Sequence, residues 1–454
     1  MVVTDQTLHE KLLQVMDESQ LWKGDQRRTH GFLLSPNVYE VSPDHQNQLN
    51  ALCPALNECL AGFGRLVAIA QTPEFARTDA YKLIDTVANA SAPNYYRRAQ
   101  LRRPSCLPVV CKCDFMDDET DGTLKIAEID GINKHGFGYG ALVNRLRNTI
   151  LGRYPDKCYP GIAQVIADEV KRRHTKAEGN AGIIRPSLPK IGLMAGEHER
   201  FYLPEFAIFA DELACHGVGC EVVRENDLRV VNGDDGDEIE GLPSSLLVDL
   251  PTCGYNHGLS QALMSQYMKG ELDFLLPPKS YLSSKGLMAL LRNDEHNEDL
   301  ECTLRSQIPG AALERVRRSI PPTYLITKRN LDFIRNDLVG SGTSYVLKAV
   351  TSSGMKGTVF MEDPGFETTL AELTQGRNGG YILQKEVSNK PETFSYFQPD
   401  GELRSDTWYK RVIVHFARGF VADMNITARR DKKVHGAKDC LQLGVRCLRT
   451  GGVY

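Results

Sequence analysis

One short stretch, residues 345–357, most constrains what this chain can form and bind. Residues 345–350 are mostly β-branched, aromatic or aliphatic, with Lys348 as the one charge, and they predict a strand. Residues 351–357 are rich in glycine and small hydroxyl side chains, so they predict a turn whose backbone N–H groups can face phosphate oxygens. A lysine on the preceding strand can reach the same phosphates. The alternative is an ordinary hairpin with a solvated lysine.

The length and charge of the chain predict several domains and argue against a nucleic-acid partner. A chain of 454 residues predicts two or three domains. The formal net charge of −4 gives no basic surplus, so we expect no nucleic-acid partner. No apolar run reaches the roughly 18 residues of a membrane span, and the N-terminus lacks the pattern of a secretory signal. We therefore expect no membrane association and a cytoplasmic protein.

The twelve cysteines are scattered and show no paired Cys-x-x-Cys spacing. A structural zinc site needs four converging ligands, which this pattern does not supply. We interpret the cysteines as reduced and mostly buried small residues.

Several segments have a clear structural pattern. Leucines at helical spacing predict that residues 1–92 are mainly helical. Strands alternate with a helix over 189–250, which predicts a parallel, Rossmann-like sheet, although no Gly-x-Gly-x-x-Gly follows a strand. Residues 408–431 predict two more strands. The tail, 432–454, has four glycines and is predicted to be a loop.

Acidic residues gather in the predicted hairpin 108–130. Glu128 and Asp130 share one face of a strand because its side-chain period is two, and Asp114 on the partner strand can join them. Three converging carboxylates repel one another unless a cation lies between them, and Mg²⁺ prefers such oxygen ligands together with substrate phosphates. The alternative is a solvent-facing acidic edge.

Two basic or glycine-rich segments flank this hairpin. Four arginines within 97–103 form either a solvated face or an anion clamp, since guanidinium presents a rigid fork to phosphate or carboxylate. Residues 131–140 hold four glycines and predict a loop close to a ligand. Lys285 lies near the start of an apolar helix, where it can bind phosphate or extend along the surface.

Taken in order, these residues resemble the ATP-grasp ligases, and among them the circularly permuted branch of glutathionylspermidine synthase. That branch has an Asp on one strand and Glu-x-Asn on the next, which Asp114 and Glu128 resemble. Asp130 stands at the Asn position and adds a negative charge. The resemblance implies that Asp114, Glu128 and Asp130 bind Mg²⁺. A second pair with acid-x-Asn spacing, Asp423 and Asn425, ranks below them because Asp114 would then have no role.

The resemblance also implies an ATP site. Lys285 and Lys348 match the two phosphate-binding lysines of the family, residues 352–357 match its lid, and residues 381–387 match the strand that frames adenine. The residues expected to bind ATP on this basis are Lys285, Lys348, Ser352, Ser353, Gly354, Gly357, Gln384, Lys385, Glu386 and Val387.

The family reaction is the formation of an amide by an ATP-dependent carboxylate–amine ligase. The carboxylate takes the γ-phosphoryl group of ATP, and an amine then displaces phosphate from the acyl phosphate. The implied cofactors are ATP and Mg²⁺, and the implied substrates are a small carboxylate, such as an amino acid or short peptide, and an amine. An arginine is expected to stabilise the transferring group, and the candidates are Arg98, beside Arg97, Arg102 and Arg103, and the late Arg430.

The implied fold class is α/β (α+β), an ATP-grasp fold with a Rossmann-like α/β domain and a helical N-terminal region. The expected divisions are 1–92 helical, 93–185 with the metal ligands, 186–270 Rossmann-like, and 271–454 nucleotide-binding. Two alternatives stay open, an ATP-dependent phosphotransferase and a non-catalytic nucleotide-binding protein. The sequence leaves the oligomeric state open, a homodimer included.

Overall fold

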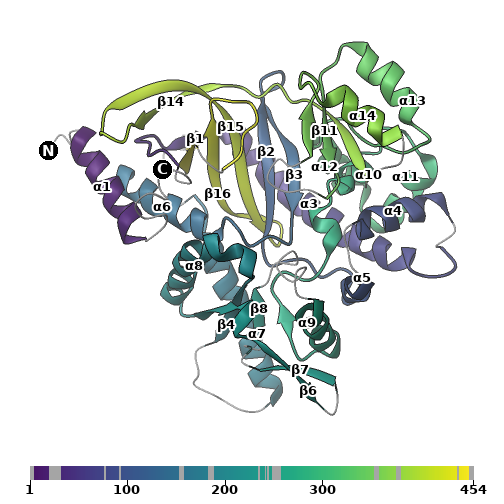
Figure 1. Ribbon diagram of the computed structural model, residues 1–454, viewed down its shortest axis with the longest axis horizontal. Helices are drawn as coiled ribbons and strands as arrows, with labels where there is room; N and C mark the ends of the chain where they lie inside the picture. The colour runs from purple at the N-terminus through teal and green to yellow at the C-terminus, as the bar shows by residue number, and fades with distance from the viewer. Residues whose placement is uncertain are drawn as a thin grey trace, which may run out of the picture.

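The computed structural model describes most of the chain, and the elements lie in the order shown in Figure 1. The described residues are 5–19, 32–75, 78–90, 94–152, 158–181, 189–233, 236–240, 242, 245–247, 257–351, 357–374, 380–436 and 439–448.

The largest sheet in the described part of the chain, here called the large sheet, has seven strands and stands at the centre of Figure 1. Its order is β1-β17-β16-β15-β2-β3, with β14 paired to β15 outside that path. Its strands are β1 (Tyr39–Val41), β17 (Cys440–Cys447), β16 (Phe420–Arg429), β15 (Leu403–Ala417), β2 (Cys111–Asp118), β3 (Thr123–Asp130) and β14 (Glu392–Phe397). The sheet is mixed because β1 runs parallel to β17, whereas β2 and β3 form the predicted antiparallel hairpin.

Helices cover the large sheet. The helix α3 (Pro43–Ala70) packs on β16 and β3, and α6 (Phe137–Leu151) packs on β16 and β17. Most residues of β16 are buried, which is the pattern of a strand covered on both faces.

A second sheet, here called the antiparallel sheet, holds the stretch 345–357 that opened the sequence analysis. Its order is β10-β13-β11-β12, and every neighbouring pair is antiparallel. The strands are β10 (Thr323–Leu325), β13 (Tyr381–Lys385), β11 (Tyr345–Ala349) and β12 (Thr358–Phe360). Phe366 and Leu370 of α14 (Phe366–Thr374) join Tyr345, Leu347 and Leu383 in a small apolar core beneath it.

The predicted Rossmann-like unit is present as a parallel sheet with the order β5-β4-β8-β9. It lies at the bottom of Figure 1, beside the helices α7, α8 and α9. Its elements are β4 (Lys190–Ala195), β5 (Gly219–Arg224), β8 (Ser245–Leu247), β9 (Asp273–Phe274), α7 (Ile162–Ala181), α8 (Leu203–Cys215) and α9 (His257–Lys269). The hairpin of β6 (Arg229–Gly233) and β7 (Gly236–Glu240) extends from it.

The N-terminal segment is mainly helical, as the leucine spacing predicts. Its helices are α1 (Asp5–Glu18), α3 and α4 (Asp79–Asn89), and α5 (Asn94–Leu101) follows. The hydroxyl of Ser42 caps α3 by accepting from the backbone N–H of His45, and Leu49, Leu52, Leu56 and Leu60 are buried. The helices α10 (Gly286–Arg292), α11 (Glu298–Gln307) and α12 (Gly310–Ser319) pack against α3 or α4. The boundaries of the expected domains remain predictions.

The helix α3 is also long and apolar enough to cross a membrane by length and composition, the one such helix among the described residues. Of its most apolar window, 61% is buried inside the protein, which is typical of a core helix.

The prediction of a loop-like tail is wrong for residues 440–447, which form β17 between β1 and β16. Leu441, Leu443 and Val445 alternate along this strand and are each at most 1% exposed. The alternation is the signal of a strand, but the neighbouring glycines suggested a loop. Gly444 is required because an added Cβ would lie 2.6 Å from the Cβ of Arg147 on α6.

We predict that Leu443→Ala lowers the free energy of unfolding by about 2–5 kcal/mol, because it removes a buried side chain from an inner strand. The matched control is Arg446→Ala, which removes an exposed ion pair with Glu40 and is expected to cost about 1 kcal/mol or less. Urea unfolding followed by circular dichroism measures both. Equal, small losses in the two variants would contradict the placement of the tail in the sheet.

Candidate active site

A cavity of about 380 Å³ lies between the antiparallel sheet and the edge of the large sheet formed by β2 and β3. Its lining brings together eight of the residues predicted from the sequence: Asp114, Glu128, Lys285, Lys348, Gln384, Lys385, Glu386 and Val387. These residues come from segments as far apart in the sequence as Asp114 and Val387, so it is the fold that gathers them.

Lys348 connects the two sheets that form the cavity. Its Nζ donates to the side-chain Oε1 of Gln384 on β13 at 2.6 Å and to the backbone oxygen of Ala127 on β3 at 3.1 Å. Burial lowers the pKa of Lys348 to about 8, and the neighbouring charge of Lys285 acts in the same direction. A phosphate group beside it would reverse this effect, because an anion favours the charged amine.

Lys285 stands at the start of α10 and is 5% exposed. Its backbone N–H donates to the oxygen of Val350, just after β11, and its Nζ lies 2.9 Å from Oε1 of Glu128. The two lysines therefore both line the cavity and both contact the same strand, β3.

The predicted carboxylate trio is divided among three cations rather than gathered around one site. Asp114 lies directly opposite Glu128 in the hairpin register, and Lys112 lies opposite Asp130. Lys112 was not singled out from the sequence, although it stands on the same face of β2 as Asp114. Burial would lower the pKa of Lys112, but the carboxylates of Asp114, Asp130 and Glu128 raise it above its ordinary value.

Each carboxylate has its own partner. Asp114 pairs with Arg411 at 3.1 Å and Glu128 with Lys285 at 2.9 Å. Asp130 pairs with Lys112 at 3.5 Å, accepts from the hydroxyl of Ser283 at 2.6 Å, and does not line the cavity. In the described part of the chain, no group of three His, Cys, Asp or Glu side chains is arranged to hold a metal ion.

Two of the three carboxylates nevertheless fit Mg²⁺. Oδ1 of Asp114 is buried and accepts no hydrogen bond from any described residue, and Glu128 faces the cavity. Mg²⁺ is commonly bound by one or two carboxylates together with substrate phosphates. The donor set therefore fits the ion through Asp114 and Glu128, with Asp130 engaged elsewhere.

The strand expected to frame adenine lines the cavity, but the side chain of its glutamine is hydrogen-bonded within the protein. Gln384 is 2% exposed, and its amide accepts from Lys348 and donates to Oγ1 of Thr323 at 3.0 Å. Glu386 accepts from Lys432 at 2.9 Å. The apolar side of the cavity comes from Val346, Phe360, Val387 and Val434. This surface has the chemistry that a purine ring requires.

Neither predicted arginine lines the cavity. Arg98 is exposed on α5. Arg430 pairs with Asp406 at 2.9 Å and stacks over Trp408. The arginine that lines the cavity is Arg411 on β15, beside Asp114. Its position directly before the apolar run 412–414 of a predicted strand was the available signal.

Other predicted features lie partly or wholly elsewhere. Ser352, Ser353 and Gly354 fall outside the described residues. Gly357 has φ +68°, and an added Cβ would lie 2.7 Å from that of Ala349, so glycine is required there. Asp423 hydrogen-bonds to Asn144 and lines a different cavity of about 150 Å³.

The glycine-rich stretch 131–140, predicted to be a loop, becomes the first turn of α6 from Phe137 onward. Its loop part is held by two buried carboxylates at the parallel-sheet unit. Lys134 and His135 both contact Oε1 of Glu199, at 2.7 and 2.8 Å. The N–H of Gly136 donates to Glu205 at 2.5 Å. Burial raises the pKa of Glu205 to about 8, although the backbone N–H groups around it act in the opposite direction.

We predict that Glu205→Gln changes how stability depends on pH. A carboxyl whose pKa rises from 4.5 to about 8 on folding stabilises the protein fully below pH 4.5, and this contribution is lost as the pH rises from 4.5 to about 8. Glutamine keeps the acceptor and cannot ionise. Relative to the wild type, the variant should gain stability between pH 5 and pH 8, on the order of 1 kcal/mol per pH unit.

Thermal unfolding at several pH values measures this difference, with the exposed Glu221→Gln as the control. Parallel pH profiles for the wild type and Glu205→Gln would show that Glu205 is not buried as described.

Comparison with known proteins gives the fold. No protein-family model matches the chain, and no curated protein matches it. Among solved structures, a glutathione synthetase-like effector from Globodera pallida, in its apo form, is similar with a TM-score of 0.56 at 14% identity, and the match covers 94% of this chain and 95% of that one. This similarity shows that the chain shares the fold of that protein over nearly its whole length.

Two further solved structures match less well. A protein described as a gamma-glutamylcysteine synthetase, from Methylobacillus flagellatus, has a TM-score of 0.38 at 11% identity, covering 79% of this chain and 86% of that one. D-alanyl-alanine synthetase A from Vibrio cholerae has a TM-score of 0.26 at 14% identity, covering 50% and 67%. These scores are too low to support a conclusion about this chain.

Proposed function

We propose that this protein is an ATP-dependent carboxylate–amine ligase that forms an amide bond through an acyl phosphate. The observation that supports this most is the joint placement of Lys285, Lys348, Asp114, Glu128 and Arg411 around one cavity with an apolar side. The similarity in fold to a glutathione synthetase-like protein fits the same reaction class. The substrates we expect are an amino acid or short peptide with a free carboxylate, and an amine.

The residues around the cavity divide into three tasks. Lys285 and Lys348 bind the phosphate oxygens of ATP as point charges from one end. The apolar residues near β13 bind the base. Arg411 stands beside Asp114, where it can stabilise the negative charge that develops on the transferring group.

Asp114 and Glu128 are the residues that would hold Mg²⁺. When bound, the ion neutralises phosphate charge and polarises the bond to the γ-phosphoryl group. The substrate carboxylate oxygen attacks the γ-phosphorus and ADP leaves. The amine then attacks the acyl carbon and inorganic phosphate leaves, so one amide forms for each ATP consumed. Arg411 in this account replaces Arg98 and Arg430 as the arginine of the site.

One observation favours a second candidate, a nucleotide-binding protein without catalysis. Each of the three predicted metal ligands is already paired with a protein cation, Lys112, Lys285 or Arg411. Carboxylates that are paired with protein cations do not require Mg²⁺ to balance their charge. The site can therefore be stable without the metal ion on which the ligase reaction depends.

We predict ADP release when the wild type is given ATP, Mg²⁺ and a mixture of amino acids and short peptides as acids and amines. Lys348→Ala should lower the rate at least about 100-fold, because it removes a charge that acts on the transferring phosphoryl group. The exposed Lys390→Ala, which leaves the cavity lining intact, is the matched control. A coupled ADP assay measures the rate, and mass spectrometry identifies the product.

The outcomes separate the candidates. An amide product supports the ligase, whereas a phosphorylated acid without amide indicates a phosphotransferase. Nucleotide binding by calorimetry without ADP release in any mixture supports the non-catalytic protein. Absence of nucleotide binding by the wild type would contradict both proposals.

A further inference from the structure

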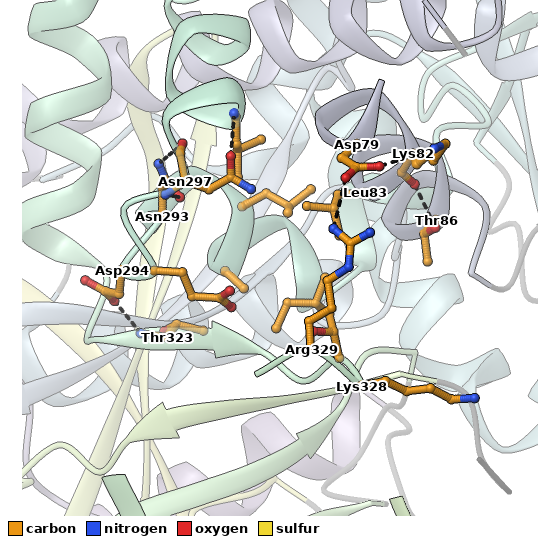
Figure 2. A pocket seen from close by; sticks show the side chains of 16 residues that line it. Asp79, Lys82, Leu83, Thr86, Asn293, Asp294, Asn297, Thr323, Lys328 and Arg329 are labelled. Carbon is orange, nitrogen blue, oxygen red and sulfur yellow. Dashed lines mark hydrogen bonds and ion pairs between the residues drawn. The ribbon is translucent and has the colours of Figure 1, made fainter. Parts of the chain in front are cut away.

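A second cavity, of about 340 Å³, lies behind the antiparallel sheet, between β10, α4, α10 and α11. Figure 2 shows it from close by. Its lining shares no residue with that of the first cavity. Thr323 lines the second cavity and Gln384 the first, and the two side chains hydrogen-bond to each other. The wall between the cavities is therefore about one strand thick, and a ligand of the second cavity would not reach Lys348.

The floor of the second cavity is apolar and mostly buried. Ala289 and Leu290 come from α10, Leu300 from α11 and Leu325 from β10, and each is at most 9% exposed. Leu83 of α4 closes the floor from the other side. This surface suits an aliphatic group of a ligand.

One end of the cavity is acidic. Asp294 accepts from the backbone N–H of Thr323 at 2.7 Å and pairs with Arg292. Glu295 accepts from the amide of Asn330 at 2.6 Å, and no ion pair to a described cation accompanies that bond. The Glu295 residue as a whole is exposed, and partial burial of its carboxyl raises its pKa, which the hydrogen bond from Asn330 partly offsets. A ligand ammonium group would give this carboxylate a positive partner.

The opposite end is basic. Figure 2 shows Asp79, Lys82 and Arg329 together, across the cavity from Asp294 and Thr323, whereas Lys328 points away. Arg329 and Lys82 both pair with Asp79, at 2.9 and 3.2 Å, so two cations share one carboxylate. The Arg329 side chain is 81% exposed and keeps further guanidinium donors for another anion.

We propose that the second cavity binds a short zwitterionic peptide. The ammonium group of the peptide lies at Glu295, its carboxylate at Arg329, and its aliphatic side chain on the leucine floor. A ligand with charges of opposite sign at its two ends can pair with Glu295 and Arg329 at once while its aliphatic part covers the leucine floor. The inference goes beyond the proposed ligase, because the ligand is bound behind the sheet and is not consumed.

The test uses L-alanyl-L-leucine as the probe, measured by calorimetry on the full chain without nucleotide. Blocking the ammonium group as N-acetyl-L-alanyl-L-leucine, or the carboxylate as L-alanyl-L-leucine amide, should weaken binding by about tenfold each. The Glu295→Gln variant should bind the N-acetylated and the free dipeptide with the same affinity. The Arg329→Gln variant should bind the dipeptide amide and the free dipeptide with the same affinity. These two variants therefore locate each end of the probe.

The controls are Glu298→Gln, at an exposed position on α11, and Lys348→Ala, in the first cavity. Both should bind the dipeptide like the wild type. The inference is overturned if the wild type shows no saturable binding, if Glu295→Gln and Arg329→Gln respond to the blocked probes like the wild type, or if Lys348→Ala abolishes binding. None of these results depends on ADP release, so this inference and the proposed ligase fail separately.

Discussion

The contact of Lys348 with both sheets is the constraint on which the rest of the site depends. Its amine reaches Gln384 within the antiparallel sheet and the backbone of Ala127 in the large sheet. A buried lysine without such acceptors would be costly, so the two sheets must meet closely here. Lys285 repeats the arrangement through Glu128. Lys348 therefore has neutral hydrogen-bond acceptors, whereas Lys285 and Arg411 are balanced by Glu128 and Asp114.

The ion pairs around the cavity are compatible with both proposed functions, the ligase and the non-catalytic nucleotide-binding protein. Asp114, Glu128 and Asp130 pair with Arg411, Lys285 and Lys112, respectively. A nucleotide would compete with the carboxylates for the lysines, and Asp114 and Glu128 would then be available to Mg²⁺. Under the proposed function, the ion pairs would keep the site in place, and an exchange of partners would accompany nucleotide binding.

Much of the fold could be predicted because strong local patterns agree with it. The strand with Lys348, the acidic hairpin, the parallel unit and the leucine-rich helix are all present. What could not be predicted depends on contacts between distant segments. The C-terminal strand β17 is part of the large sheet because it pairs with β1 and β16. Asp130 does not line the cavity and instead pairs with Lys112, which lies opposite it in the hairpin. Arg411 lines the cavity beside Asp114 because β15 pairs with β2. Local sequence carries no information on such partners.

The most direct test of the account is a crystal structure of the protein with Mg²⁺ and a non-hydrolysable ATP analogue. The account predicts phosphate oxygens within hydrogen-bonding distance of Lys285 and Lys348, the base against the apolar residues beside β13, and a metal ion between the phosphates and Asp114 or Glu128. An analogue bound at another place on the chain, or bound here with both lysines still on Glu128 and Gln384, would contradict it.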